Sequence, residues 1–217
     1  PEFTTIELYE AYTDYHGMMD ITENLINACA QAVCGSDIIT YQGEEVNLQK
    51  PFRRLTMIEA VKEYTGVDFD TFAGDNEKAH AVAKELGLPV EKHHVWGDIL
   101  NLAFEEKVEE KLLQPTFICD YPVEVSPLTK RKADRPELVE RFELFITRRE
   151  FANAYTELND PIDQKERFEY QMKLREQGDE EALRIWKWFS DVSLIEFNRI
   201  YGKLGVTFDH FMGESFY

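Results

Sequence analysis

Two segments of the sequence place polar and aromatic side chains at every second position. Glu7 and Tyr9 form the first set, and Asn153, Tyr155 and Glu157 form the second. Because side chains along a β-strand alternate between its faces, each set would lie on one face of a strand. Carboxylates accept charge-assisted hydrogen bonds from ammonium groups and aromatic rings attract cations, so these residue types suit a cation pocket. The alternative is the solvated face of an antiparallel sheet, where most single charged residues lie.

A second pair of carboxylates, Glu143 and Glu150, could bind Mg²⁺, because this hard ion favours oxygen ligands and often bridges to phosphates. Glu143 alternates with Phe142 and Leu144, which we expect to face the core. Glu150 has the wrong parity to share a face with Asn153 unless a β-bulge adds one residue. The sequence leaves this point open, and two surface carboxylates are the alternative reading.

Several common catalytic and metal-binding patterns do not occur in the sequence. His93 and His94 have no third ligand at metal-binding spacing, which favours a loop pair. Cys29, Cys34 and Cys119 lack such spacing too, which favours a reduced, cytoplasmic protein. No Gly-rich nucleotide loop and no nucleophile elbow is found. Any nucleotide would therefore be bound in another way.

The composition is that of a globular protein with a strong acidic excess. The chain has 217 residues, of which 43% are hydrophobic and 30% charged, so it can bury one sizeable core. Its 42 acidic and 24 basic residues give a net charge of −18, which argues against nucleic-acid binding by this piece alone. No run approaches the roughly 18 apolar residues of a membrane helix, and no signal peptide is visible. Since the first residue is not Met, we expect a processed chain or a fragment.

Hydrophobic periodicity predicts interleaved strands and helices without the regular βαβ rhythm of a parallel sheet. We therefore expect an α+β fold with an antiparallel sheet flanked by helices and a helical C-terminal tail. Asp20 is the expected N-cap of the first helix, and Thr56 with Glu59 forms a capping box that would open the second. The expected strands span residues 3–12, 37–49 (a hairpin turning at 41–44), 116–120, 141–147 and 150–158. Besides the short helix that Thr56 would open, the expected helices span residues 21–33, 75–86, 98–113, 161–177, 180–190 and 193–205.

Several runs of the sequence resemble signatures of the lysyl-tRNA synthetase family, in the family's order and with family-like spacing. They are PEFTTIELY (1–9), QPTFI (114–118), YPVEVSPL (121–128), RFELF (141–145) and NAYTELNDP (153–161). The first run resembles the second half of the family's motif 2. The resemblance covers residues 1–182 and implies a partial class II synthetase catalytic domain.

The resemblance also implies roles for the cation-pocket residues. Glu7 would hold the α-amino end of the amino acid, and Glu157 would pair with the ε-ammonium group of lysine. Tyr9, Asn153 and Tyr155 would complete the side-chain pocket. The related aspartyl and asparaginyl enzymes need a cationic or amide-reading pocket, so an acidic pocket favours lysine.

ATP and Mg²⁺ are implied as well, with Glu143 and Glu150 as the residues that would bind both. The implied reaction is attack of the lysine carboxylate on the α-phosphate of ATP, giving lysyl-adenylate, followed by transfer to a tRNA hydroxyl. Such chemistry depends on positioning and charge stabilisation, so no acid–base catalytic residue is singled out. Intact members of the family are homodimers that bind lysine, ATP and tRNA.

The last part of the chain departs from this family. Four runs in this last part are WKWF (186–189), VSL (192–194), LGV (204–206) and GESFY (213–217). On these runs, residues 183–217 resemble arginyl-tRNA synthetases, a class I family, which divides the chain at residue 182. A natural helical extension is the alternative. The arginines of motifs 2 and 3 are missing, so we expect the polypeptide alone to be nearly inactive in ATP–pyrophosphate exchange. Alternative functions are an arginine–tRNA ligase fragment, a non-catalytic lysine-binding module and a protein-lysylating paralogue.

Overall fold

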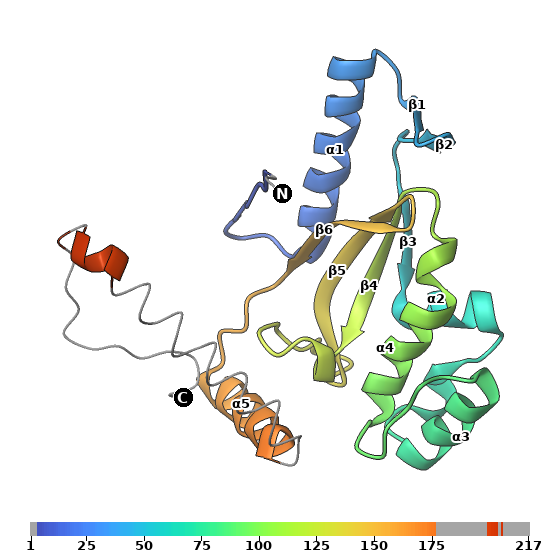
Figure 1. Cartoon of the computed structure of the whole chain (residues 1–217), viewed down its shortest axis with the longest axis vertical. Helices are drawn as coiled ribbons and strands as arrows, with labels where there is room; N and C mark the ends of the chain where they lie inside the picture. Colours follow the sequence, from blue (N-terminus) through green and yellow to red (C-terminus); the bar gives the residue numbers. More distant parts are fainter. Residues whose placement is uncertain (1–3, 177–198, 204, 206–217) are drawn as a thin grey trace. The chain divides into compact units, whose positions relative to one another are not determined.

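The computed structural model describes residues 4–176, 199–203 and 205 (Figure 1). The chain divides into two compact units, residues 1–159 and 160–217. Among the described residues, the second unit contributes α5 (Pro161–Glu176) and a helical stretch at 199–203. The residues predicted to bind lysine, ATP and Mg²⁺ all belong to the first unit.

A four-stranded sheet in the order β3-β4-β5-β6 forms the centre of the first unit. Its strands are β3 (Arg53–Thr56), β4 (Thr116–Pro122), β5 (Leu138–Ile146) and β6 (Arg149–Tyr155). β3 runs parallel to β4, whereas β4–β5 and β5–β6 are antiparallel. The predicted α+β class is confirmed, but the sheet is mixed rather than purely antiparallel. The parallel pair is possible because the long helical connection from β3 to β4 serves as a crossover.

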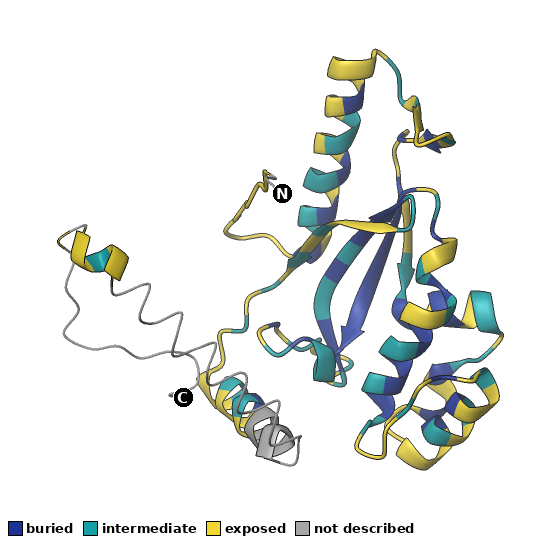
Figure 2. Cartoon of the chain, viewed as in Figure 1, coloured by how far each residue is buried: buried dark blue, intermediate teal, exposed yellow. Residues whose placement is uncertain are grey.

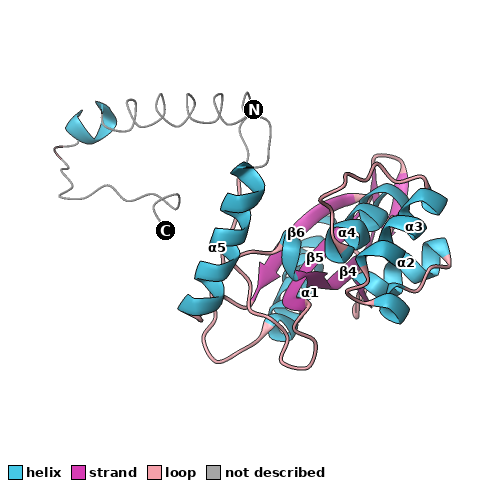
Figure 3. Ribbon diagram, turned by 90° about the horizontal axis from the view of Figure 1, so that it is seen from below, coloured by secondary structure: helices cyan, strands magenta, loops and turns pink. Residues whose placement is uncertain are grey.

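Helices cover both faces of this sheet. They are α1 (Tyr15–Cys34), α2 (Met57–Thr65), α3 (Asn76–Leu86) and α4 (Trp96–Lys107). On one face, Met19 of α1 joins a hydrophobic cluster with Phe117, Phe142 and Leu144 of the strands. On the other face, where Figure 3 shows α2, α3 and α4 together, Phe145 enters a second cluster. Strands β4 and β5 lie between the two clusters and are the most deeply buried part of the sheet (Figure 2).

Shorter elements connect these parts. The hairpin of β1 (Ile38–Tyr41) and β2 (Glu44–Asn47) turns where the sequence predicts. Three 3₁₀ turns follow: η1 (Phe69–Phe72), η2 (Glu109–Lys111) and η3 (Val123–Val125). No helix in the described part of the chain is long and apolar enough to cross a membrane.

Capping residues determine where α1 and α2 begin. Asp14 caps α1, because its carboxylate accepts hydrogen bonds from the backbone N–H groups of His16 (2.9 Å) and Gly17 (3.1 Å). The prediction that Asp20 is the N-cap is therefore wrong; Asp20 lies inside α1 and forms an ion pair with Arg54.

The capping box of α2 is confirmed. The Glu59 N–H donates to the Thr56 hydroxyl oxygen at 3.1 Å, and the Thr56 N–H donates to the Glu59 carboxylate at 2.9 Å. Helix α3 also has the predicted limits, since Asp75 caps its start. Gly87 ends it with a left-handed φ of 67°, a conformation that glycine adopts without strain.

The predicted strand at residues 3–12 is not formed. Within its described part, residues 4–10 take part in no described backbone hydrogen bond, and a strand requires a paired neighbour. The strands predicted near 116, 141 and 150 and the helix near 161 are confirmed with shifted ends. The helix predicted at 98–113 spans Trp96–Lys107 and is followed by η2. The helix predicted at 180–190 and most of the one at 193–205 lie outside the described residues.

Candidate active site

A cavity of about 790 Å³ lies between residues 6–14 and the chain that leaves β6. All the residues predicted to bind the amino acid line this cavity: Glu7, Tyr9, Asn153, Tyr155 and Glu157. The Tyr9 hydroxyl oxygen lies 3.4 Å from Oε2 of Glu7. The structure therefore brings together two segments that lie far apart in the sequence.

Strand β6 presents polar and small side chains on opposite faces, as its alternation predicts. Asn153 and Tyr155 are exposed, whereas Ala152 and Ala154 pack against the hydrophobic cluster that includes α1. The alanines let that side of the strand approach its neighbours closely. The polar face is left available to the cavity.

The cavity is a negative environment. The carboxylate of Glu7 has the largest influence on Tyr9 and raises the pKa of its hydroxyl; desolvation, Glu157 and Tyr155 raise this pKa further. A field that disfavours a tyrosinate favours a cation in the same place. Tyr9 is 81% exposed, so the cavity is open to solvent.

A β-bulge brings Glu150 onto the face of Glu143, which settles the parity question. Glu143 pairs with Asn153 in the register of β5 and β6, but Phe145 pairs with Glu150. Phe151 is the extra residue on β6. Because paired residues point to the same side of a sheet, Glu143, Glu150 and Asn153 share one face.

Glu143 is largely buried beside this bulge, with its side chain 13% exposed. The Tyr121 hydroxyl donates to its Oε2 at 2.8 Å, and the Arg141 guanidinium donates to its Oε1 at 2.5 Å. Burial raises the pKa of the Glu143 carboxyl despite the lowering effects of Arg141 and Tyr121. The carboxylates of Glu150 and Glu109 raise this pKa further.

Carboxylates are the ligand type that Mg²⁺ prefers, and several lie near Glu143. Glu143 lines a cavity of about 190 Å³ together with Glu105 and Glu109, and Glu150 is not among the residues that line it. Mutual repulsion among carboxylates here contributes to the raised pKa values of Glu143 and Glu109, and a divalent cation would relieve it. Among the described residues, no group of three or more such side chains is placed to hold a metal ion.

Arg141 connects the two groups of predicted residues, and sequence reasoning missed it. Its Nε donates to Oδ1 of Asn153 at 3.1 Å, and its Nη2 donates to Glu143. Its Nη1 donates to the Ser126 hydroxyl at 2.8 Å, and the guanidinium lies 4.5 Å from the centre of the Tyr121 ring. Strand alternation could have indicated Arg141, because it stands two residues before Glu143 on the same strand and therefore shares its face.

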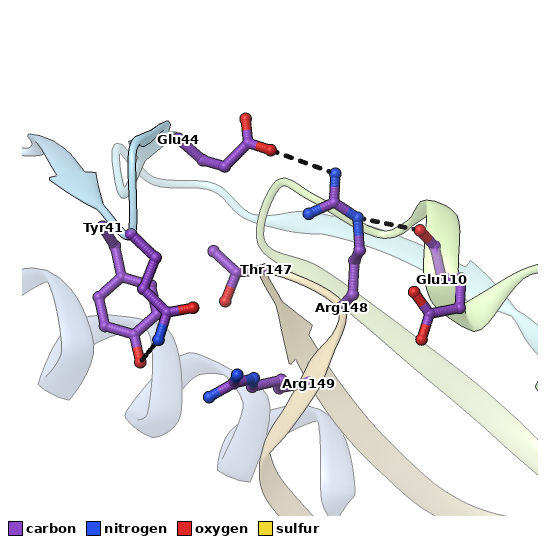
Figure 4. Close-up of a pocket in the computed structure, with 7 residues that line it drawn as sticks. Tyr41, Glu44, Glu110, Thr147, Arg148 and Arg149 are labelled. Carbon is purple, nitrogen blue, oxygen red and sulfur yellow. Dashed lines mark hydrogen bonds and ion pairs between the residues drawn. The ribbon is translucent and has the colours of Figure 1, made fainter.

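A third cavity, of about 310 Å³, lies at the turn between β5 and β6 and contains none of the predicted residues (Figure 4). Arg148 donates from Nε to the backbone oxygen of Glu110 and pairs with Glu44 at 3.4 Å. Arg149 lines the same cavity. Because two carboxylates offset the two guanidinium groups, the lining indicates no class of ligand.

The sequence of the chain is similar to those of known proteins over most of its length. The family model of tRNA synthetases class II (D, K and N) matches residues 1–196. A lysine–tRNA ligase of Carboxydothermus hydrogenoformans is 59% identical over 184 residues, which are 84% of this chain and 37% of that protein. Lysine–tRNA ligases of Clostridium acetobutylicum (56% over 188 residues; 85% of this chain and 36% of that protein) and a Nostoc species (57% over 183 residues; 84% and 32%) are also similar. The chain thus spans about a third of the length of the curated relatives that it matches.

Proposed function

Because this chain belongs to the class II tRNA synthetases of the D, K and N group, we propose that its acidic cavity binds lysine and that the whole protein is a lysine–tRNA ligase. The curated relatives described above carry that name. The observation that carries the proposal is one cavity lined by Glu7, Tyr9 and Glu157, a set that suits a primary ammonium group.

In this proposal the two carboxylates hold the two amino groups of lysine. Glu157 accepts hydrogen bonds from the ε-ammonium group, and Glu7 accepts them from the α-amino group. Tyr9, Asn153 and Tyr155 line the space between them. The carboxylate of lysine then attacks the α-phosphate of ATP and displaces pyrophosphate, which gives lysyl-adenylate. A tRNA hydroxyl takes the lysyl group from the adenylate, and AMP leaves. Holding the reactants in this arrangement supplies much of the rate enhancement.

Glu143 and Glu150 are the residues that would hold Mg²⁺ beside the ATP phosphates. Bound Mg²⁺ would neutralise charge on the phosphate oxygens. Arg141 keeps the Glu143 carboxylate in a fixed orientation through its hydrogen bond. No side chain has to transfer a proton in the attack on the α-phosphate, because a carboxylate is already deprotonated at neutral pH.

The remaining expectations concern the whole protein. We propose that it works in the cytoplasm as a homodimer and that residues 183–217 form a separate helical part. The curated relatives align with this chain over 182 to 188 residues, or 84 to 85% of its length. The family model reaches further, to residue 196, and most of this tail lies outside the described residues.

Calorimetric titration of the chain with lysine, arginine and ornithine, with and without ATP and Mg²⁺, tests the proposal. We expect lysine to bind most tightly. Glu157→Gln should weaken lysine binding by about 10- to 100-fold, the usual value of a hydrogen bond between charged groups. Glu85→Gln, on the exposed side of α3, is the matched control and should leave binding unchanged. Arginine preference, or lysine binding that ignores Glu157→Gln, would refute the assignment.

A further inference from the structure

A group of three polar side chains joins α1, β4 and the loop before β5; Tyr15 and Asp120 are buried and Lys132 is partly buried. Lys132 Nζ donates to Oδ2 of Asp120 at 2.8 Å and to the Tyr15 hydroxyl oxygen at 3.1 Å. The Tyr15 hydroxyl donates to Oδ1 of Asp120 at 2.7 Å. Tyr15 and Asp120 are only 4% and 8% exposed. None of the three lines the lysine cavity.

The energetics of this group favour a positioning role over a stabilising one. An ion pair taken out of water adds little to stability, because the loss of hydration offsets the attraction between the charges. Asp120 also has a φ of 60°, at the point where the register of β4 shifts between Cys119 and Tyr121. That conformation is unfavourable for a residue other than glycine. What the group does provide is a fixed distance between three separate elements.

One of those elements carries the first wall of the cavity. Tyr15 is the first residue of α1 and follows Thr13 and Asp14, both of which line the cavity. The segment that precedes them holds Glu7 and Tyr9, and it takes part in no described backbone hydrogen bond before α1. The start of α1 is therefore the point from which this wall is placed.

The loop that carries Lys132 also holds the opposite wall. The N–H of Lys130 donates to the backbone oxygen of Thr156 at 2.9 Å. Thr129 forms a β-bridge with Glu157. A single loop is thus joined to Glu157 on one side and, through Lys132, to the start of α1 on the other.

We propose that Lys132 is a positioning residue that sets the distance between the Glu7 wall and the Glu157 wall, and thereby the length of the amino acid that the cavity accepts. The inference rests on the proposed lysine-binding function. Ornithine differs from lysine by one methylene group. Walls held at a fixed distance leave one amino group of ornithine without its carboxylate partner, whereas loosened walls can close on either ligand.

Calorimetric titration of the full chain with lysine and with ornithine tests this inference. We expect the native chain to prefer lysine by about tenfold or more, as one methylene group commonly allows. Lys132→Met keeps the length of the side chain and removes its charge and donors; the lysine-to-ornithine ratio should then fall by about threefold or more. Lys132→Arg should recover part of the ratio. Lys92→Met removes an exposed lysine of another loop and should leave the ratio unchanged.

The possible outcomes are distinguishable. Equal weakening of both ligands, with an unchanged ratio, would show that Lys132 only supports the fold and would overturn the inference while lysine binding stands. A native chain that binds neither ligand would overturn the proposed function and this inference together. If thermal unfolding shows that Lys132→Met does not fold, Tyr15→Phe decides the matter, because it removes one hydroxyl and leaves the ion pair. We expect the ratio to fall in that variant too.

Discussion

At the scale of single residues, Glu143 should give Mg²⁺ binding a distinctive pH dependence. Burial raises the pKa of its carboxyl above the ordinary value of 4.5. Mg²⁺ binds the deprotonated form, so near this raised pKa binding must displace a proton. We predict that Mg²⁺ affinity, measured by calorimetry, falls as the pH is lowered from about 7 to about 5, and that Mg²⁺ binding releases protons. Glu143→Gln should abolish both the proton release and most of the binding.

The raised pKa of Glu143 can be checked independently through the pH dependence of the free energy of unfolding. A carboxyl whose pKa is higher in the folded state stabilises the fold fully below its unfolded pKa, and this contribution is lost as the pH rises through the folded pKa. The free energy of unfolding of the native chain, compared with that of Glu143→Gln, should therefore decrease as the pH rises above about 4.5. A difference that does not change with pH would contradict the raised pKa.

Parity predicted only the part of the cavity lining that β6 supplies, because Glu7 and Tyr9 lie in a segment that forms no strand. Neither residue types nor parity could predict the groups that hold the lining in place. Alternation alone places Asn153 and Tyr155 on one face, and that holds in the structure. The network of Tyr15, Asp120 and Lys132 was not predictable, because it depends on a bulge in β4 and on a loop with no periodic pattern. Long-range contacts of this kind depend on the register of several elements at once.

At the scale of elements, the pairing of Glu150 with Phe145 should determine whether Glu150 can serve the proposed Mg²⁺ site. A one-residue change of register moves a side chain to the opposite face of a sheet. Deleting Phe151 would remove the bulge but leave Glu150 opposite Phe145, and therefore on the face of Glu143, because Ala152 still pairs with Leu144. We predict that the deletion leaves Mg²⁺ affinity near the native value, whereas Glu150→Gln lowers it by about tenfold, as expected for the loss of one carboxylate ligand. Lysine affinity should change much less, since Asn153 keeps its pairing.

Phe151→Ala is the matched control for this deletion. It removes a side chain that is 53% exposed but keeps the residue count of β6, so Mg²⁺ affinity should stay near the native value. A loss of Mg²⁺ affinity in both variants would attribute the effect to the phenyl ring. A loss in the deletion alone would show that the pairing with Phe145 is not enough to place Glu150.

Local signals predicted most elements, and the failures have local causes. Capping chemistry located α2 and α3, because Thr56 and Asp75 satisfy N–H groups that the helix leaves unpaired. It failed for α1, where both Asp14 and Asp20 are chemically able to cap and only the first does so. The strand at 3–12 failed because alternation shows that a segment can pair, not that a neighbour is present. Parallel pairing of β3 was equally hidden, since it depends on the crossover rather than on either strand.

At the scale of the whole molecule, the acidic excess is accompanied by ion pairs that already engage several cationic side chains of the described residues. They link Lys and Arg from several elements to nearby carboxylates: Arg53–Glu63, Arg54–Asp20, Lys62–Asp68, Lys132–Asp120, Arg135–Asp70, Arg141–Glu143 and Arg148–Glu44. Each of these cations is therefore already neutralised by a carboxylate of the chain.

This distribution of charge leads to a prediction about RNA. Protein–nucleic acid affinity comes mainly from counterions released as Lys and Arg neutralise phosphates, and a net charge of −18 opposes that process. We predict that the chain binds tRNA more weakly than about 10⁻⁴ M at about 150 mM salt, measured by fluorescence anisotropy, and with little salt dependence. Replacing the exposed Glu85 and Glu106 with Lys should strengthen binding measurably if net charge is the cause. Micromolar binding by the native chain with a steep salt dependence would instead require a local basic surface. Recognition of tRNA would then belong to this part of the protein.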